Sequence, residues 1–474
     1  MNMRPPSFST LARPQPIALA GRRVLVLGSG DTGLSVVNWL KSEGGSVRIA
    51  DTRTSPPHKN GLHEEEIVTG KFKASLLKGM DLVCISPGLS LHEELIQTAI
   101  TRNIPVVGDI ELFAWAVRGK SSSKVLAVTG TNGKSTVSAL AGHLLRSAGI
   151  DCEVAGNIGP AALDALMKRS TASSTPDPAA WVLELSSYQL ETTWSLEPDA
   201  AALLNVSEDH LDRYAGLAAY VEAKARIFMG RGAQVLNRCD SASMALATGS
   251  EMRGRVQVTF GMDAPSVAED FGIAHVAGRA WLVRGGEPIF AADELPLAGA
   301  HNASNALAAC ALAHLAGAPL AALAGGLRSF RGLPHRMQRV ALRGGVEWFD
   351  DSKGTNVGAT VAALNGLSRS VVLILGGEGK GQNFAPLVPA IRARVKHVLL
   401  IGRDAALIEK AIASSGIPLE QMVSMEKAVE RAAQIAVTGD AVLLSPACAS
   451  FDMFRDYKHR GEAFAAAVKA LGHD

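Results

Sequence analysis

The sequence predicts an α/β protein of three consecutive domains with mainly parallel sheets. Apolar runs of strand length alternate with helical patterns along almost the whole chain, as in repeated strand–helix–strand units. The length of 474 residues corresponds to about three domains. Apolar residues make up 47% of the chain and charged residues 19%, so a sizeable core can form in each domain.

The predicted domains cover residues 1–110, 111–332 and 333–474. Strand-like runs in the first domain are RVLVL, SVRIAD, DLVCISPG and IPVVGD. The second domain starts at KVLAVTG, after a serine-rich stretch, and continues with AAWVLELSS and AAALLNVS. The third contains VEWFDDSK, SVVLILGG, HVLLIGR and AVLLSPA.

Charge and cysteine content exclude several classes of protein. The net charge of only +2 does not indicate binding to nucleic acid or to an anionic membrane surface. The five cysteines are scattered and form no CxxC motif, which argues against a disulfide framework or a structural zinc site and favours the reducing cytoplasm. The N-terminus has no apolar signal-peptide core. The alanine-rich stretch 305–327 contains His314 and Pro319 and predicts two short buried helices, with no membrane insertion.

The run GSGDTG predicts a dinucleotide-type loop near the start of the first domain. Gly28, Gly30 and Gly33 follow a predicted strand and open a helix, and Asp51 closes the next strand. In this context the glycines let the backbone approach a diphosphate, and the acid can bind a ribose hydroxyl. Three readings stay open: a nicotinamide cofactor, another diphosphate ligand held by a Rossmann-like domain, and a glycine turn without a ligand.

A second glycine loop, GTNGKST, begins the central domain and predicts ATP binding. It is shorter than the usual phosphate-binding loop, since Val128 stands where the first glycine would be. The backbone N–H groups from Gly130 to Lys134 can still face a phosphate at a helix N-terminus. Lys134 can neutralise the β- and γ-phosphate oxygens, and Ser135 can offer its hydroxyl to Mg²⁺. The first loop lacks a lysine, so we expect it to hold a nucleotide handle, such as a sugar nucleotide, that does not react.

Eight motifs then resemble the Mur ligases over nearly the whole chain. They are TGTNGKST, LELSSYQLE, LNVSEDHLDRY, HNASNALAA, GLPHR, DDSKGTN, LGGEGKGQNF and LLSPACASFDMFRDYKHRGEAF. The first is shared by the whole superfamily, including folylpolyglutamate synthetase. The DDSKGTN and SPACASFD runs resemble the D-glutamate-adding branch, and the chain has no DNPR run of the diaminopimelate- or lysine-adding branch. Glu378 and Tyr457 are mild departures, since aspartate and phenylalanine are familiar there.

The resemblance implies a Rossmann-like first domain that grips UDP, a central P-loop ATPase-type domain, and a Rossmann-like third domain that binds the amino acid. ATP would phosphorylate the carboxylate of UDP-N-acetylmuramoyl-L-alanine, and the amine of D-glutamate would attack the acyl phosphate, in peptidoglycan precursor synthesis. It implies a cytoplasmic enzyme with two Mg²⁺ sites, small-molecule substrates only and no nucleic-acid partner. We expect a monomer.

The resemblance also assigns residues. Catalytic roles fall to Lys134, Glu184, His210 and Lys224, and metal binding falls to Ser135, Glu184, His210 and Lys224, the last as a carbamate formed with CO₂. ATP binding is assigned to Gly130, Thr131, Asn132, Gly133, Lys134, Ser135, Thr136, Asn305, Arg336 and Asp351. UDP-substrate binding is assigned to Gly30, Asp31, Thr32, Asp51, Thr52, Arg53, Ser86, Gly88 and Asn157. D-Glutamate binding is assigned to His210, Lys353, Thr355, Lys380, Ser450 and Tyr457.

Plain structural roles stand beside these assignments. Glu184 ends a predicted buried strand, where a carboxylate is expensive unless it is paired, metal-bound or satisfied by backbone amides. His210 could be an ordinary loop histidine, and Lys224 a solvated helix lysine. Asn305 could cap the following helix. Cys448 is interpreted as a packing residue, since no acyl-cysteine step is required.

Two other functions stay open at this stage. A folate polyglutamylating ligase would share the ATP loop but would add L-glutamate and would not require UDP. A nicotinamide-dependent oxidoreductase would use the GSGDTG loop for NAD. A nucleotide-gated binding protein without turnover is disfavoured, because binding alone would not need Lys134, Glu184, His210 and Lys224 together.

Overall fold

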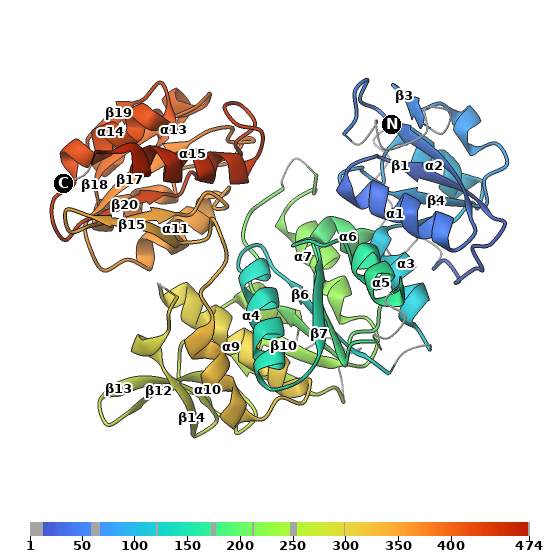
Figure 1. Ribbon diagram of the computed structural model, residues 1–474, viewed down its shortest axis with the longest axis horizontal. Coiled ribbons are helices and arrows are strands. Elements are labelled where there is room, and N and C mark those ends of the chain that lie inside the picture. Colours follow the sequence, from blue (N-terminus) through green and yellow to red (C-terminus); the bar gives the residue numbers. More distant parts are fainter. Residues whose placement is uncertain are drawn as a thin grey trace.

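The computed structural model describes residues 13–57, 67–119, 122–171, 177–210, 213–246, 254–297 and 299–472. The described strands form three separate sheets, one in each of three lobes along the chain (Figure 1). This confirms the predicted α/β class with three consecutive domains. We keep the limits near residues 110 and 332 as proposed boundaries. Residue 110 lies in a helix that follows the first sheet, and residue 332 lies in the connection before the third.

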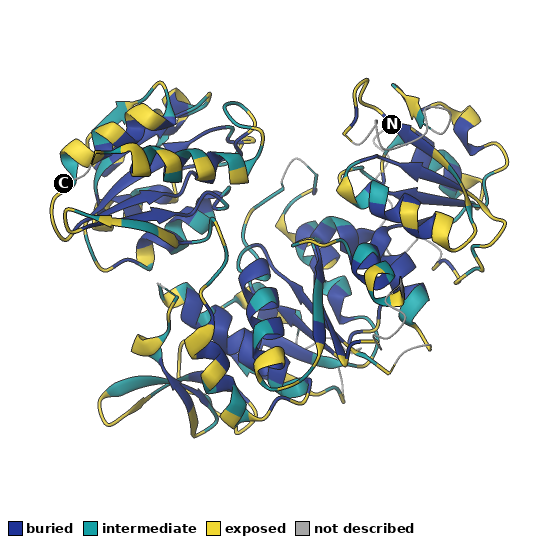
Figure 2. Ribbon diagram, in the orientation of Figure 1, coloured by how far each residue is buried: buried dark blue, intermediate teal, exposed yellow. Residues whose placement is uncertain are grey.

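The N-terminal lobe is a five-stranded parallel sheet in the order β3-β2-β1-β4-β5. Its strands are β1 (Arg23–Leu27), β2 (Ser46–Asp51), β3 (Ile67–Thr69), β4 (Leu82–Ile85) and β5 (Val106–Val107). Its helices are α1 (Asp31–Ser42), α2 (Glu94–Thr101) and α3 (Asp109–Val117), with a 3₁₀ turn at Ala74–Leu77. Strands β1, β4 and β5 are almost entirely buried, as expected for a parallel sheet covered on both faces, whereas β3 at the sheet edge and the first half of β2 are partly exposed (Figure 2).

The central lobe has a nine-stranded sheet in the order β14-β13-β12-β11-β10-β9-β6-β8-β7. The strands are β6 (Lys124–Thr129), β7 (Cys152–Gly156), β8 (Ala180–Glu184), β9 (Ala200–Leu203), β10 (Ala233–Asn237), β11 (Gln257–Phe260), β12 (Phe271–Val276), β13 (Arg279–Arg284) and β14 (Glu287–Ala291). The helices are α4 (Lys134–Ser147), α5 (Ala162–Thr171), α6 (Ser187–Glu191), α7 (Leu217–Ala225), α8 (Ser241–Ala245), α9 (Ala300–Leu315) and α10 (Leu320–Ser329). The last two confirm that the alanine-rich stretch forms two helices: α9 is largely buried, as expected, whereas α10 buries only Leu323, Gly326 and Leu327.

The C-terminal lobe has a six-stranded sheet in the order β15-β16-β20-β17-β18-β19. The strands are β15 (Gln338–Arg343), β16 (Val346–Asp350), β17 (Val371–Gly376), β18 (Val395–Ile401), β19 (Leu419–Gln421) and β20 (Ala441–Leu444). The helices are α11 (Val357–Asn365), α12 (Leu387–Arg394), α13 (Ala405–Ile412), α14 (Met425–Ile435) and α15 (Tyr457–Ala470). In the portion of the chain that is described, no helix combines the length and apolarity needed to cross a bilayer.

Among the described strands, antiparallel pairing occurs only at the sheet edges. The strands β12, β13 and β14 form an antiparallel meander, and β15 pairs antiparallel with β16. Of these strands, the sequence predicted β16 but not β12, β13, β14 or β15. The physical cause is short connections: Ala277 and Gly278, both with positive φ, join β12 to β13, and such a turn is too short for a parallel crossover.

Candidate functional site

The ATP loop lies between the end of β6 and the start of α4, as predicted. Gly133 has a φ of 86°, in the left-handed region, and immediately precedes α4. A Cβ atom at Gly133 would meet the side-chain oxygen of Asn305 at 2.5 Å. Only glycine therefore fits here, and the contact places Asn305, on α9, directly against the loop.

Two cations lie on this loop. The Lys134 ammonium donates to the carbonyl oxygens of Gly130 (2.8 Å) and Thr131 (2.9 Å), and burial lowers the pKa of Lys134. The Arg336 guanidinium, from the segment that enters the C-terminal lobe, donates to the Ser135 hydroxyl at 2.6 Å. Two residues predicted to contact ATP from distant parts of the sequence are thus brought to the same helix N-terminus.

A cavity of about 380 Å³ opens beside the loop. Six of the residues assigned to ATP line it: Asn132, Gly133, Thr136, Asn305, Arg336 and Asp351. The other four, Gly130, Thr131, Lys134 and Ser135, belong to the same turn but are not part of the lining. Burial raises the pKa of Asp351 to about 7, and its carboxylate accepts a hydrogen bond from Ser445 at 2.8 Å.

All nine residues assigned to the UDP substrate line a second cavity, of about 740 Å³. Hydrogen bonds stabilise the charged form of Asp51 in this cavity. Its carboxylate accepts from the backbone N–H of Ser29 (2.9 Å) and the Nε of Arg53 (2.8 Å). Burial alone would raise the pKa of Asp51, but these hydrogen bonds hold it well below its usual range. The dinucleotide-type loop therefore has a cavity large enough for a ligand beside it. This cavity argues against the alternative of a glycine turn without a ligand.

The two cavities share one residue, Lys353, which lines both. Its ammonium lies 3.9 Å from the ring centroid of Tyr457, another residue of the C-terminal lobe that lines the larger cavity. Burial, with the nearby charge of Arg336, lowers the pKa of Lys353 to about 8. The Lys353 side chain thus lies where a ligand in the cavity at one glycine loop would come close to a ligand in the cavity at the other loop.

Glu184 ends β8 and is 1% exposed. One carboxylate oxygen accepts from the Asn157 side chain at 2.6 Å, and the other is buried with no hydrogen-bond partner among the described residues. An unsatisfied buried carboxylate oxygen fits a divalent cation, for which oxygen is the preferred ligand. The described residues contain no cluster of three or more His, Cys, Asp or Glu side chains, so Mg²⁺ would need phosphate, water or a modified residue to complete its ligands.

Lys224, on α7, is 1% exposed and donates to the carbonyl oxygen of Gly130 at 2.9 Å. Burial, aided by the charge of Lys134, lowers the pKa of Lys224 well below its ordinary value. The solvated-lysine alternative is therefore wrong. A lysine that can be neutral at the edge of the phosphate loop is chemically suited to carbamylation.

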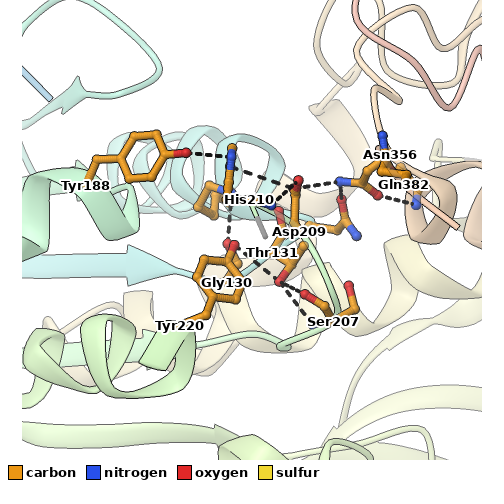
Figure 3. A network of polar contacts seen from close by, with 12 residues as sticks. Gly130, Thr131, Tyr188, Ser207, Asp209, His210, Tyr220, Asn356 and Gln382 are labelled. Atoms are coloured by element: carbon orange, nitrogen blue, oxygen red, sulfur yellow. Dashed lines mark hydrogen bonds and ion pairs between the residues drawn. The ribbon is translucent and has the colours of Figure 1, made fainter. Parts of the chain in front are cut away.

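His210 lies on the loop after β9 with a φ of 55°. Its Nδ1 is 2.7 Å from the Tyr188 hydroxyl, and its Nε2 is 3.8 Å from the Asp209 carboxylate (Figure 3). Burial lowers the pKa of His210, which favours the neutral imidazole. Tyr188 was not predicted as a site residue, because a tyrosine on a short helix gives no sequence signal of its own.

The residues assigned to D-glutamate fall into two linked groups besides His210. Lys353, Thr355 and Tyr457 lie around the first turns after β16 and at the start of α15. Lys380 and Ser450 lie on two loops joined by backbone hydrogen bonds between Glu378 and Ala449.

The two groups are connected by Arg460, which is 1% exposed and donates to the carbonyl oxygens of Ser352 (2.8 Å) and Cys448 (3.0 Å). Arg460 was not predicted as a site residue, because an arginine within a helix gives no sequence sign that it is buried. The adjacent thiol agrees with the packing interpretation: burial raises the pKa of Cys448 to about 12.

Three family models match the chain in order. The Mur ligase MurD-like N-terminal domain matches residues 22–108, the Mur ligase middle domain residues 128–313, and the Mur ligase glutamate ligase domain residues 335–448. The structure of UDP-N-acetylmuramate-alanine ligase MurC from Thermotoga maritima aligns with a TM-score of 0.61 at 19% identity, over 95% of this chain and all of that one. A pseudomurein peptide ligase type C from Methanothermus fervidus gives 0.58 at 17% identity, over 95% of this chain and all of that one. At these identities the two structures support the fold.

Full-length relatives are far more similar in sequence. The chain is 53% identical to the UDP-N-acetylmuramoylalanine--D-glutamate ligase of Nitrosospira multiformis, over 96% of both chains. It is 51% identical to the enzyme of the same name from Aromatoleum aromaticum, over 96% of this chain and 98% of that one. With its three domain models in order and half of its residues shared with these enzymes over nearly its whole length, this chain belongs to the Mur ligase family.

Proposed function

We propose that this chain joins D-glutamate to UDP-N-acetylmuramoyl-L-alanine at the expense of ATP, as a step of peptidoglycan precursor synthesis. The observation that carries this is Lys353, which lines both the cavity at the ATP loop and the cavity at the dinucleotide-type loop. A ligase of this kind must bring a carboxylate and a triphosphate together, and a cation between them reduces their repulsion.

In the first half-reaction, a carboxylate oxygen of the sugar nucleotide attacks the γ-phosphorus, and the bond to the ADP oxygen breaks. Lys134 and Arg336, both at the N-terminus of α4, are assigned to the phosphates. Mg²⁺, when bound, would neutralise the phosphate oxygens and polarise the γ-phosphoryl group. Glu184 is proposed to hold it through the buried oxygen that has no hydrogen-bond partner among the described residues.

In the second half-reaction, the D-glutamate amine attacks the acyl carbon, loses a proton, and the phosphate leaves with the electrons of its bond. Asp209 is proposed as the proton acceptor, since its carboxylate lies beside the His210 imidazole. The carboxylates of D-glutamate need donors, and Lys353, Thr355, Lys380 and Ser450 are assigned to them. We place the reaction in the cytoplasm, carried out by a monomer.

We also propose that Lys224 reacts with CO₂ to form a carbamate, with loss of one proton, and so supplies the carboxylate of a second Mg²⁺ site. Its burial and the neutral amine this favours support the proposal. The variant Lys224→Ala should lose activity by about 10²-fold or more, and acetate or formate should restore part of it by replacing the carbamate. Absence of rescue at any concentration, in a variant that still binds ATP, would remove the carbamate from the mechanism.

The test of the function is phosphate release with four substrate pairs. ATP and UDP-N-acetylmuramoyl-L-alanine are supplied with D-glutamate or L-glutamate, and ATP and a folate are supplied with the same two amino acids. We expect release only with the sugar nucleotide and D-glutamate. Release with the folate and L-glutamate alone would assign the chain to folate polyglutamylation, and saturable NADH binding that UDP does not displace would reopen the oxidoreductase alternative.

A further inference from the structure

Tyr188 contacts His210, and no part of the proposed mechanism uses it. It lies on α6, whose N-terminus is fixed by a capping box between Ser186 and Gln189. Its hydroxyl oxygen is 2.7 Å from the Nδ1 of His210, and the two ring centroids are 4.8 Å apart (Figure 3). This short contact joins a helix of the central sheet to the loop that carries His210.

The Tyr188 ring is itself held in place. The Arg213 guanidinium lies 4.3 Å from the ring centroid and also pairs with Glu191, one turn along α6, at 2.5 Å. Both members of that ion pair are nearly buried, at 11% and 4% exposure, so solvent competes little with it. The tyrosine ring therefore has few other positions open to it, and its hydroxyl is a fixed point for the imidazole.

The opposite edge of the imidazole, at Nε2, faces Asp209. The Nε2 atom of His210 is 3.8 Å from Asp209, whose carboxylate also accepts from the side chain of Asn356 at 3.1 Å. His210 has a left-handed backbone outside any helix or strand, so regular secondary structure does not set the direction of its side chain. The contact at Nδ1 then constrains which nitrogen points toward Asp209.

We propose that Tyr188 is a positioning residue that holds Nδ1 of His210 and so presents Nε2 to the reaction centre. A phenolic hydroxyl can both donate and accept, so it can keep this contact in either neutral tautomer of the imidazole. When it accepts the Nδ1 proton, the Nε2 lone pair is free for a cation. A phenylalanine would provide the same packing but neither contact. The proposal rests on the proposed function only for what Nε2 binds.

The first test reads the imidazole directly. The chain is labelled with ¹⁵N-histidine, and the His210 signals are identified as those absent from a His210→Asn variant. In the unmodified chain we expect an Nδ1 shift typical of a hydrogen-bonded nitrogen, and in Tyr188→Phe we expect this shift to move. Tyr214→Phe is the matched control, because it removes a hydroxyl from the same aromatic cluster that bonds Glu191 at 2.6 Å. An unbonded Nδ1 in the unmodified chain would overturn the proposal.

The second test measures the consequence with Mn²⁺ as a spectroscopic probe for Mg²⁺. With a non-hydrolysable ATP analogue and the sugar nucleotide present, Tyr188→Phe should weaken Mn²⁺ binding about 10-fold, as loss of an orienting partner of a metal ligand does. Tyr214→Phe should leave it within about twofold. Unchanged Mn²⁺ affinity and unchanged ¹⁵N shifts in Tyr188→Phe would refute the positioning role. A change in the shifts without any D-glutamate-dependent turnover in the unmodified chain would instead refute the proposed function and leave Tyr188 as the anchor of the imidazole.

Discussion

The central lobe meets its two neighbours in different ways. Toward the N-terminal lobe the apolar core is continuous: one cluster of buried side chains runs from Val24 and Leu82 in the first sheet to Trp181 and Leu203 in the second. The C-terminal lobe has clusters of its own, and the described contacts that join it to the centre at the ATP loop are polar, from Arg336 to Ser135 and from Asn356 to Asn132.

This difference indicates which lobe is fixed to the central lobe and which can move against it. A shared core fixes the N-terminal lobe to the central lobe, because separating them would expose apolar surface and break buried polar contacts. A lobe held by a few hydrogen bonds around the ATP cavity can instead move when the ligands of that cavity change. We therefore expect damage at the first interface to appear in stability and damage at the second to appear in ATP-dependent kinetics.

The largest expected effect lies on the ATP side. Lys134→Ala should lower kcat by about 10³-fold, since it removes a cation that stabilises charge on the transferred phosphoryl group. Binding of UDP-N-acetylmuramoyl-L-alanine, measured by calorimetry, should stay within about twofold, because the cavity proposed for it lies at the other glycine loop. Lys427→Ala, at an exposed pair with Glu430, is the control. Equal loss of turnover and sugar-nucleotide binding would end the division between the two loops.

The next effect tests Glu111, on the helix α3 that connects the first sheet to the central lobe. This carboxylate is fully buried on α3 and accepts hydrogen bonds from the backbone N–H groups of Trp194 (2.6 Å) and Ser195 (2.8 Å) and from the Trp115 ring (2.8 Å). Glu111→Ala leaves these donors buried without an acceptor and should lower the free energy of unfolding by about 3–5 kcal/mol. Urea denaturation measures this.

Glu430→Ala removes an exposed ion pair and should change the unfolding free energy by less than about 0.5 kcal/mol. If Glu111→Ala behaved like this control, the buried polar contacts would not be what ties α3 to the central lobe. Separate unfolding of the N-terminal lobe in the variant would support the comparison most directly.

The sequence predicted the fold class, the two loops and the residues around each cavity, because these depend on local patterns and on motifs that the family resemblance fixes. It did not predict Glu111, Tyr188 or Asn356. Each of these acts through a partner 22 or more residues away, and the pairing exists only once the chain has folded. A lone polar residue in a helix or a loop carries no sign of such a partner.

A smaller effect, visible through pH, is expected at Asp109. Its carboxylate accepts from the Gln189 side chain at 2.9 Å across the same interface, and burial raises the pKa of Asp109 from 3.8 to about 6. The native state therefore binds the proton more tightly than the unfolded state. Protonated Asp109 therefore adds to the free energy of unfolding. This contribution, of up to about 3 kcal/mol, is complete below about pH 4 and is lost as the pH rises through about 6.

Asp109→Asn keeps an acceptor for Gln189 but carries no charge. It should be more stable than the unmodified chain at pH 8, by an amount that shrinks toward zero near pH 4. Thermal unfolding across pH 4–8 measures the difference, with Asp293→Asn as an exposed carboxylate control. A stability difference that does not depend on pH would show that Asp109 does not titrate in this range.

The smallest effect belongs to the polar interface. The side-chain amide of Asn356 donates to Asn132 on the ATP loop (3.2 Å) and to Asp209 (3.1 Å), while its oxygen accepts from Ala359 (2.8 Å) and caps α11. Asn356→Ser keeps a capping oxygen but is too short to span the interface, so stability should change by only a few tenths of a kcal/mol. Loss of the two contacts, worth about 1 kcal/mol, should raise the KM for ATP about fivefold and leave the KM for the sugar nucleotide unchanged.

Asn356→Asp separates the cap from the contact still further. Aspartate caps a helix as well as asparagine does, but it would place a second carboxylate against Asp209 and should raise the KM for ATP more than serine does. If both variants unfolded more easily while their KM values stayed the same, Asn356 would matter only as a cap. The position of the C-terminal lobe would then be set by packing. The two interfaces of the central lobe would differ only in the area that they bury.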